Sequence, residues 1–211
     1  MLLSGGSGLI GRELLRLLLQ DSSVASVRAV GRRSLAEADP KLIAQVIDFS
    51  DVPELAPVDE AYVALGTTIK VAGSQAAFRA VDLDAVVALA RAAKASGATK
   101  IGIVSAMGAD PASRVLYNRV KGEMERAVTA VGIATTVFAR PSMLLGDRAS
   151  LQQPPRAAER AVQSAMAVLR PLIPANLRAI EAGDVAASLI EGVRTLPPGV
   201  HVLLSGQLQR R

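Results

Sequence analysis

The chain has no cysteine and no tryptophan, and it has a single histidine. Without cysteine it can form neither a disulfide nor a thiolate zinc site, and it has no cysteine nucleophile. The lone histidine, His201, cannot build a metal site with other imidazoles, so we expect no metal. No basic-then-apolar leader precedes the first glycines, which predicts a cytoplasmic protein.

Aromatic residues make up only 2% of the chain, and its basic residues are scattered. The net charge of +5 would suit an acidic partner, but few aromatic platforms are available to stack bases. We therefore expect no nucleic-acid partner and attribute part of the positive charge to a cofactor with phosphates. Apolar runs stay shorter than the roughly 18 uncharged residues of a membrane helix, so no membrane span is expected.

At 211 residues, with 50% hydrophobic and 20% charged residues, the chain is long enough for one α/β domain with a full core. Short apolar runs alternate with segments of helical periodicity, which is typical of a doubly wound parallel sheet. Buried strands are predicted at residues 1–4, 27–30, 43–47, 61–65, 100–104, 133–138 and 200–204. Helices are predicted at residues 9–20, 74–96, 113–131 and 184–194. We expect a single domain over residues 1–211.

Small polar residues and glycines mark the ends of the predicted helices. Ser74 and Asp184 are expected to cap the start of their helices, and Gly97 and Gly132 to end two others. The first strand has only about four residues, which is short for a central strand. Either this strand is short or the start of the chain is missing.

Glycines follow the first strand in the stretch Ser-Gly-Gly-Ser-Gly-Leu-Ile-Gly over residues 4–11. The spacing fits both Gly-x-Gly-x-x-Gly and Gly-x-x-Gly-x-x-Gly. Between a strand and a helix, such a turn lets the backbone approach a pyrophosphate at the helix N-terminus. The alternative is a glycine-rich turn that caps an ordinary helix. The cofactor contacts predicted here are Gly5, Ser7, Gly8, Leu9, Ile10 and Gly11.

Two arginines follow the second predicted strand. Sites for the unphosphorylated nicotinamide cofactor carry an acidic residue there, which accepts a hydrogen bond from the ribose 2′-hydroxyl. This chain instead has Arg32 and Arg33, and arginine can grip a 2′-phosphate through two hydrogen bonds. The sequence therefore predicts NADP(H), with preference for NADPH over NADH. The alternative is that both arginines are solvated loop charges.

The third and fourth predicted strands are also followed by polar residues. Open α/β sheets bind ligands at the carboxyl ends of their strands. Asp48 is placed to reach the adenine amino group, and the run Leu65, Gly66, Thr67 and Thr68 to line the ribose. The alternatives are a turn at the glycine and a helix cap at one of the threonines.

A serine, a tyrosine and a lysine form the candidate reactive set. Tyr117 and Lys121 stand four residues apart, which places them on one face of a helix, and Ser105 ends a predicted strand. A cation beside a phenol favours the phenolate, and a nearby hydroxyl could hold the carbonyl oxygen with which the phenol exchanges a proton. The alternatives are a serine that begins a turn, a tyrosine whose hydroxyl lies at the surface, and a solvated lysine.

Taken in order, these motifs resemble the short-chain dehydrogenase/reductase superfamily over nearly the whole chain. Segments 65–70, 78–82, 105–110 and 140–148 are similar to its atypical branch, which includes the Tat-interacting oxidoreductase-like proteins and their bacterial relatives. The resemblance implies a Rossmann fold with NADPH laid across the switch point of the sheet.

The resemblance also implies roles for individual residues. Ser105 would orient a carbonyl, and Tyr117 would give or take the proton. Lys121 would assist the tyrosine and hold the nicotinamide ribose. Pro141 and Ser142 would contact the nicotinamide end of the cofactor.

One residue departs from the pattern of the superfamily. Many members have an asparagine that supports a proton relay, and Asp82 is its nearest counterpart in this chain. Members of the atypical branch are also often assigned cofactor binding without a known substrate, and some act as regulators.

The leading interpretation is an NADPH-dependent oxidoreductase that reduces a small-molecule carbonyl substrate. The alternative is an NADPH-binding regulatory or scaffold protein without essential catalysis, and a third is an epimerase or dehydratase acting on a nucleotide-linked sugar. Homodimers are common in the superfamily, so a homodimer or a protein partner is expected by analogy alone.

A small, irregular C-terminal lobe is expected on the substrate side, at residues 147–180. The segment carries more bases than acids, which would suit an acidic or phosphorylated substrate. Its arginines are Arg148, Arg156, Arg160, Arg170 and Arg178. Its apolar residues would equally suit an apolar pocket or a partner helix, and solvated arginines on an amphipathic helix are the alternative.

Overall fold

The computed structural model describes residues 1–145 and 174–210. A sheet of seven parallel strands forms its centre, in the order β3-β2-β1-β4-β5-β6-β9. The strands are β1 (Leu2–Ser4), β2 (Val27–Gly31), β3 (Leu42–Val46), β4 (Glu60–Val63), β5 (Lys100–Val104), β6 (Thr135–Arg140) and β9 (Gly199–Leu204). The chain builds outward from β1 in one direction and then from β4 in the other, so the fold is the predicted doubly wound Rossmann fold.

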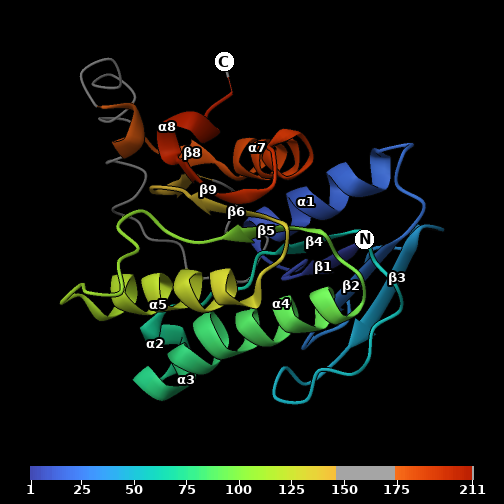
Figure 1. The fold of residues 1–211 in the computed structure, drawn as a ribbon, viewed down its shortest axis with the longest axis horizontal. Coiled ribbons are helices and arrows are strands. Elements are labelled where there is room, and N and C mark those ends of the chain that lie inside the picture. The colour runs from blue at the N-terminus through green and yellow to red at the C-terminus, as the bar shows by residue number, and fades with distance from the viewer. Residues whose placement is uncertain (146–173, 211) are drawn as a thin grey trace.

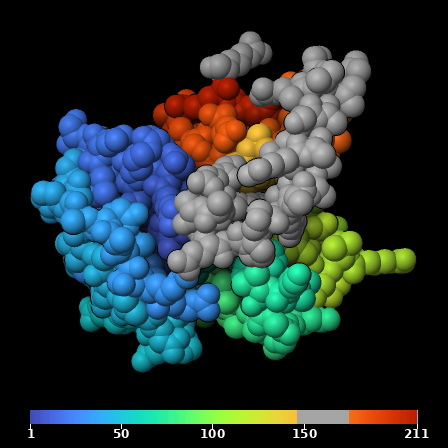
Figure 2. Space-filling model, turned by 180° about the vertical axis from the view of Figure 1, so that it is seen from behind, coloured from blue at the N-terminus to red at the C-terminus, as the bar shows by residue number. Residues whose placement is uncertain are grey.

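Helices cover both faces of the sheet (Figure 1). On one face lie α1 (Leu9–Gln20) and α7 (Ala182–Thr195), and on the other α4 (Ala85–Ala95) and α5 (Leu116–Val131). The shorter elements are α2 (Ile69–Ala72), α3 (Gln75–Arg79), the π-helix η1 (Ala80–Asp84), β7 (Leu144–Leu145), the 3₁₀ helix η4 (Ala175–Leu177), β8 (Ile180–Glu181) and α8 (Ser205–Leu208). In Figure 2 the N-terminal third (blue) lies beside the segment that carries α2 to α4 (green).

Two hydrophobic cores lie on the two faces of the sheet because successive side chains of a strand point to opposite sides. Leu2 belongs to the core beneath α4 and α5, whereas Leu3 belongs to the core beneath α1 and α7. Both leucines are fully buried. The central strand is therefore buried on both faces, which is why it begins with two apolar residues, and its one polar side chain, Ser4, donates a hydrogen bond to the Val30 oxygen at 3.1 Å.

The edge strand β3 differs from the prediction of a buried strand at 43–47. Ile43 is 44% exposed and Val46 is 59% exposed, although their side chains point to opposite faces. The cause is topological: among the described residues, neither the connection 32–41 nor the connection 47–59 contains a helix that could cover β3. The apolar character of the strand alone did not reveal that both of its faces are partly exposed.

The predicted helix ends are largely found in the structure. The Ser74 hydroxyl accepts a hydrogen bond from the Ala77 N–H at 3.0 Å, and Gly132 ends α5 with a left-handed φ of 72°. The N-cap assigned to Asp184 was wrong. Helix α7 begins at Ala182, so Asp184 lies inside the first turn, where its charge favours the helix dipole.

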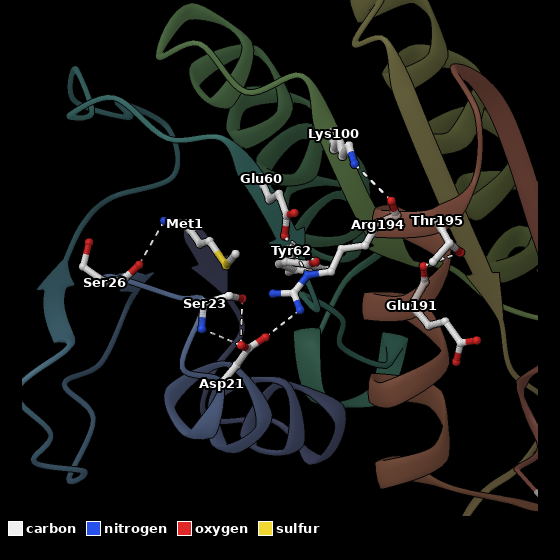
Figure 3. A network of polar contacts seen from close by, with 10 residues as sticks. All are labelled: Met1, Asp21, Ser23, Ser26, Glu60, Tyr62, Lys100, Glu191, Arg194 and Thr195. Carbon is white, nitrogen blue, oxygen red and sulfur yellow. Dashed lines mark hydrogen bonds and ion pairs between the residues drawn. The ribbon is translucent and has the colours of Figure 1, made fainter.

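A polar network fastens α1 and α7 to the strand end that lies opposite the site (Figure 3). Arg194 reaches Asp21 at 2.6 Å and Glu60 at 3.4 Å. Glu60 also accepts a hydrogen bond from the hydroxyl of Tyr62 at 2.9 Å, and burial raises the pKa of that phenol. The Lys100 ammonium donates to the backbone oxygen of Arg194 at 3.1 Å. Glu60 and Lys100 open β4 and β5, and Asp21 and Arg194 lie at the C-terminal ends of α1 and α7, so the network joins these helices to the end of the sheet that lies away from the pocket.

Candidate functional site

The glycine turn between β1 and α1 packs too closely for side chains. Gly5 has a left-handed φ of 85°, and a Cβ there would lie 2.4 Å from the Ala64 oxygen. A Cβ on Gly11 would lie 1.9 Å from the Gly5 oxygen, and the Gly8 N–H donates to that same oxygen at 2.9 Å. Of the two spacings that fit the sequence, the structure therefore depends on Gly-x-x-Gly-x-x-Gly.

Helix α1 begins at Leu9, directly after the turn, and Gly8 occupies its N-cap. Glycine has no side chain with which to cap the first N–H groups, so these donors and the positive end of the helix dipole are available to an anion. Ile10 and Gly11 are buried within the helix. The turn and the helix thus form a cradle of backbone donors.

A pocket of about 410 Å³ lies at the carboxyl ends of β1, β2 and β4. The glycine turn forms one wall, and Arg32 and Arg33, both exposed, belong to its lining. The Arg33 guanidinium donates a hydrogen bond to the Ser7 hydroxyl at 3.5 Å, so the loop after β2 contacts the glycine turn. Lining residues that the sequence analysis missed include Arg12, Phe49 and Val81. For Arg12 the signal was present, as a basic residue directly after the third glycine.

Asp48 does not line this pocket. Its carboxylate accepts a hydrogen bond from the Ser50 N–H at 2.9 Å, and this contact holds the pKa of the exposed carboxyl below its usual range. Phe49 lines the pocket instead. The predicted contact between Asp48 and adenine stays a prediction.

Residues 65–68, in the loop that follows β4, have three different tasks. Leu65 and Gly66 line the pocket. Thr68 caps α2 by accepting a hydrogen bond from the Val71 N–H at 3.2 Å. The N–H of Thr67 donates to Asp82 Oδ2 at 2.8 Å, which fixes the loop to the π-helix η1.

Lys121 and Asp82 form an ion pair at 2.8 Å, with side chains only 3% and 0% exposed. The Asp82 carboxylate therefore lies between the pocket loop and Lys121, with one oxygen toward each. Its Oδ1 has no hydrogen bond of good geometry among the described residues, so charge attraction dominates this contact. The η1 segment brings Asp82 to this position, and Val81 beside it lines the pocket.

Ser105 follows β5, and its hydroxyl lies 2.5 Å from Glu125 Oε1. The sequence analysis did not single out Glu125 or its second partner, Arg140. The guanidinium of Arg140 holds Glu125 through two contacts, Nε to Oε1 at 3.0 Å and Nη2 to Oε2 at 2.6 Å. The hydrogen bonds that Arg140 donates to Glu125 raise the pKa of its guanidinium.

Tyr117 lies in the first turn of α5 and is half-buried. Its ring stacks on the fully buried ring of Phe78, with centroids 5.6 Å apart and planes inclined by 27°. Within residues 1–145 and 174–210, its hydroxyl has no hydrogen-bond partner. Helix α5 therefore presents Tyr117 and Lys121 on one face, as predicted from their spacing.

Pro141 and Ser142 follow β6 and form hydrogen bonds with the segment after β5 and with residues near η4 and α8. The Pro141 oxygen accepts a hydrogen bond from the Met107 N–H at 3.0 Å. The Ser142 hydroxyl donates to the backbone oxygen of Arg178 and accepts from the Ser205 hydroxyl at 2.9 Å. The contact of Pro141 and Ser142 with nicotinamide stays a prediction.

Most of the expected substrate-side lobe lies outside the described residues, including Arg148, Arg156, Arg160 and Arg170. Arg178 is described and is half-buried. Within the described part of the chain, no three His, Asp or Glu side chains gather in a way that could hold a metal ion. No helix in that part is both long and apolar enough to cross a membrane.

The sequence pattern of a protein family described as NAD(P)H-binding matches residues 5–169. Protein FMP52, mitochondrial, from Coccidioides immitis (strain RS) is 35% identical over 160 residues, covering 68% of this chain and 65% of that protein. Protein HTATIP2 from Rattus norvegicus is 37% identical over 151 residues, covering 68% of this chain and 62% of that protein. The chain thus spans somewhat less than two thirds of the length of these relatives. The name of the first places that relative in mitochondria, so the predicted cytoplasmic location of this chain stays a prediction.

Solved structures share the fold. MoeE5 in complex with UDP-glucose and NAD has a TM-score of 0.71 at 18% identity, covering 96% of this chain and 74% of that chain. Human epimerase family protein SDR39U1 with NADPH has a TM-score of 0.63 at 18% identity, covering 96% of this chain and 72% of that chain. At such identities the likeness extends to the fold alone.

Proposed function

The chain belongs to the NAD(P)H-binding family, among the atypical short-chain dehydrogenase/reductases, and from this premise we propose that it is an NADPH-dependent reductase of a carbonyl substrate. The observation that carries the proposal is the pocket that brings Arg32 and Arg33 to the glycine turn. Two guanidinium groups beside a cradle of backbone N–H groups suit a ligand that has both a pyrophosphate and a further phosphate.

The residues of the pocket fit the cofactor part by part. The absence of side chains at Gly5 and Gly11 lets the backbone approach the pyrophosphate, and the N-terminus of α1 supplies donors. Arg32 and Arg33 would hold the 2′-phosphate, while Leu65 and Gly66 would line the ribose. When bound, the reduced nicotinamide supplies the hydride that reduces the carbonyl carbon.

The proposed proton donor is Tyr117. Its hydroxyl is free of partners among the described residues, and its ring is held by Phe78, so the phenol can turn its proton toward a carbonyl oxygen. Lys121 lies one turn along the same face and would hold the nicotinamide ribose with the N–H groups that Asp82 does not use. The segment 147–180 would cover the substrate side.

A second candidate function is an NADPH-binding regulatory protein without essential catalysis. Two internal contacts favour it: Asp82 binds Lys121, and Glu125 binds the hydroxyl of Ser105. These contacts engage two members of the reactive set within the protein, and a protein that only holds the cofactor would need the glycine turn, Arg32 and Arg33, but neither Ser105 nor the phenol of Tyr117.

Calorimetric titration of the purified protein with NADPH and, separately, with NADH tests the proposal. We expect NADPH to bind at least about tenfold more tightly, which corresponds to about 1.4 kcal/mol. Equal binding of both would refute the 2′-phosphate assignment, and binding of neither would refute the proposed function. Binding without oxidation of NADPH by any of a panel of aldehydes, ketones and quinones would favour the regulatory candidate.

A further inference from the structure

Residues 78–82, where α3 continues into the π-helix η1, pack against the first turns of helix α5 (Figure 1). The ring of Phe78 stacks on that of Tyr117, and the carboxylate of Asp82 lies 2.8 Å from the ammonium of Lys121. Both pairs are spaced by four (82 − 78 = 4 and 121 − 117 = 4), so each pair lies on one face of its own helical segment. One segment therefore contacts both helical members of the reactive set.

Further contacts fix this segment relative to α5 and to the pocket. Arg79 forms an ion pair with Glu123 at 2.6 Å. On the pocket side, Asp82 accepts a hydrogen bond from the Thr67 N–H at 2.8 Å, and Val81 lines the pocket. The place of the segment along α5 is thus determined by two ion pairs and by the loop that follows β4.

The two stacked rings differ in burial. The Phe78 side chain is 0% exposed, whereas Tyr117 is half-buried. Their centroids lie 5.6 Å apart and their planes are inclined by 27°, so the phenol lies along a flat, immobile surface. Since no hydrogen bond holds the Tyr117 hydroxyl within the described ranges, the stacked ring restricts how the phenol turns.

We propose that Phe78 is a positioning residue for the proton donor: its buried ring holds the Tyr117 phenol in one orientation. The proposal rests on the proposed reductase function and deepens it. A general acid must lie within hydrogen-bond reach of the atom that it protonates. A phenol that turns away from this place lowers turnover even when cofactor and substrate bind normally.

A purely structural role for Phe78 makes different predictions. If its ring only filled the space between α3 and α5, its loss would lower stability, and any effect on turnover would be the same with or without the Tyr117 hydroxyl. A positioning role predicts a loss in kcat with little change in binding. It also predicts that this loss disappears once the hydroxyl has been removed.

The experiment compares Phe78→Leu, Tyr117→Phe and the double variant in the full chain. The matched control is Phe138→Leu, which shortens an equally buried ring in β6, within the core beneath α4 and α5. The probes are 4-nitrobenzaldehyde and NADPH, and kcat, KM, the Kd of NADPH and the melting temperature are recorded. Phe78→Met, whose flexible side chain fills a similar volume, replaces Phe78→Leu if the latter does not fold.

A second readout follows the phenol without any reaction. The chain has two tyrosines and no tryptophan, so in a Tyr62→Phe background the intrinsic fluorescence comes from Tyr117. Free rotation of a side chain on the nanosecond scale lowers fluorescence anisotropy. We expect Phe78→Leu to lower the anisotropy of Tyr117 in this background and Phe138→Leu to leave it unchanged.

We expect Phe78→Leu to lower kcat about tenfold or more, while the KM of the aldehyde and the Kd of NADPH change less than about threefold. In the Tyr117→Phe background the same substitution should change the residual turnover less than about twofold. The inference is overturned if kcat falls no further than in Phe138→Leu, if the loss is the same in both backgrounds, or if the anisotropy of Tyr117 does not change. A wild-type protein that does not oxidise NADPH with any carbonyl probe overturns the proposed function itself, whereas an active wild type with an unaffected Phe78→Leu variant overturns only this inference.

Discussion

The carboxylate of Asp82 lies 2.8 Å from the ammonium of Lys121, and both side chains are almost completely buried. Asp82 simultaneously accepts a hydrogen bond from the backbone N–H of Thr67, in the loop that lines the cofactor pocket. One carboxylate therefore connects the pocket to the lysine of the reactive set.

Removing the charge of Asp82 should destabilise the protein strongly. In Asp82→Asn the buried Lys121 ammonium loses its counter-charge, and we expect a loss of about 3–5 kcal/mol in the free energy of unfolding, measured by urea denaturation. The control Glu123→Gln breaks an ion pair whose arginine is 40% exposed, and it should cost less than about 1 kcal/mol. Adding Lys121→Met to Asp82→Asn should recover part of the loss. Similar losses in Asp82→Asn and in the control would contradict the importance of the buried pair.

The arginine pair should discriminate between cofactors. Replacing both Arg32 and Arg33 by alanine removes the proposed grip on the 2′-phosphate, so the Kd of NADPH should rise about thirtyfold or more while that of NADH changes less than about threefold. Titration with 2′,5′-ADP and with 5′-AMP isolates the same phosphate without nicotinamide. Arg16→Ala, on the exposed face of α1 and paired with Glu13, serves as the control. An equal rise in the Kd values of NADPH and NADH would contradict the assignment of Arg32 and Arg33 to the 2′-phosphate.

Gly11→Ala should abolish cofactor binding. The new Cβ would lie 1.9 Å from the Gly5 oxygen, so the turn must move, and with it the donors at the start of α1. We expect the Kd of NADPH to rise at least about a hundredfold and the melting temperature to fall. Gly183→Ala in α7 meets no atom closer than 3.6 Å, and it should leave binding unchanged. Wild-type affinity in Gly11→Ala would show that the turn does not hold the pyrophosphate.

Tyr117→Phe separates binding from turnover. The phenylalanine ring can keep the stacking on Phe78, and only the hydroxyl is lost. The Kd of NADPH should stay within about threefold of wild type, whereas turnover of 4-nitrobenzaldehyde should fall by about 10²–10⁴-fold. Tyr62→Phe removes a hydroxyl that binds Glu60 at the opposite end of the sheet and should leave turnover intact. Undiminished turnover in Tyr117→Phe would exclude the phenol as the proton donor.

Acid should weaken the network that joins α1 to α7. Hydrogen bonds from Arg194 and Ser23 hold the pKa of Asp21 well below the value of about 4 expected in the unfolded chain. Because the pKa is lower in the folded state, Asp21 contributes its full stabilisation above pH 5, and this is lost progressively as the pH falls toward 3 and below. The free energy of unfolding, measured by urea denaturation at several pH values between 3 and 6, should therefore fall less steeply with decreasing pH for Asp21→Asn than for wild type. Identical slopes would show that Asp21 contributes nothing to acid unfolding.

Local patterns were enough to predict the seven strands of the sheet and the main helices, although the helix predicted at 74–96 consists of α3, η1 and α4. Helix α1 begins at Leu9 and ends at Gln20, as its apolar periodicity predicted, and β5 has the predicted bounds 100–104. The glycine turn could also be predicted, because its shape depends on residues that lie within a few positions of one another. The spacing of Tyr117 and Lys121 likewise determined that they share a face of one helix.

The partners of these residues were decided by the tertiary structure. Lys121 meets Asp82, which is 39 positions earlier (121 − 82 = 39), and Glu125 meets Ser105 and Arg140 on two different strands. Nothing in the sequence separated Glu125 from a solvated helical glutamate, because its burial depends on where β5 and β6 end beneath α5. A sequence determines which residues can donate, accept or carry charge, and whether two lie on one face of a helix. Which charges become neutralised, and which way a hydroxyl points, is decided only when distant segments pack together and exclude water.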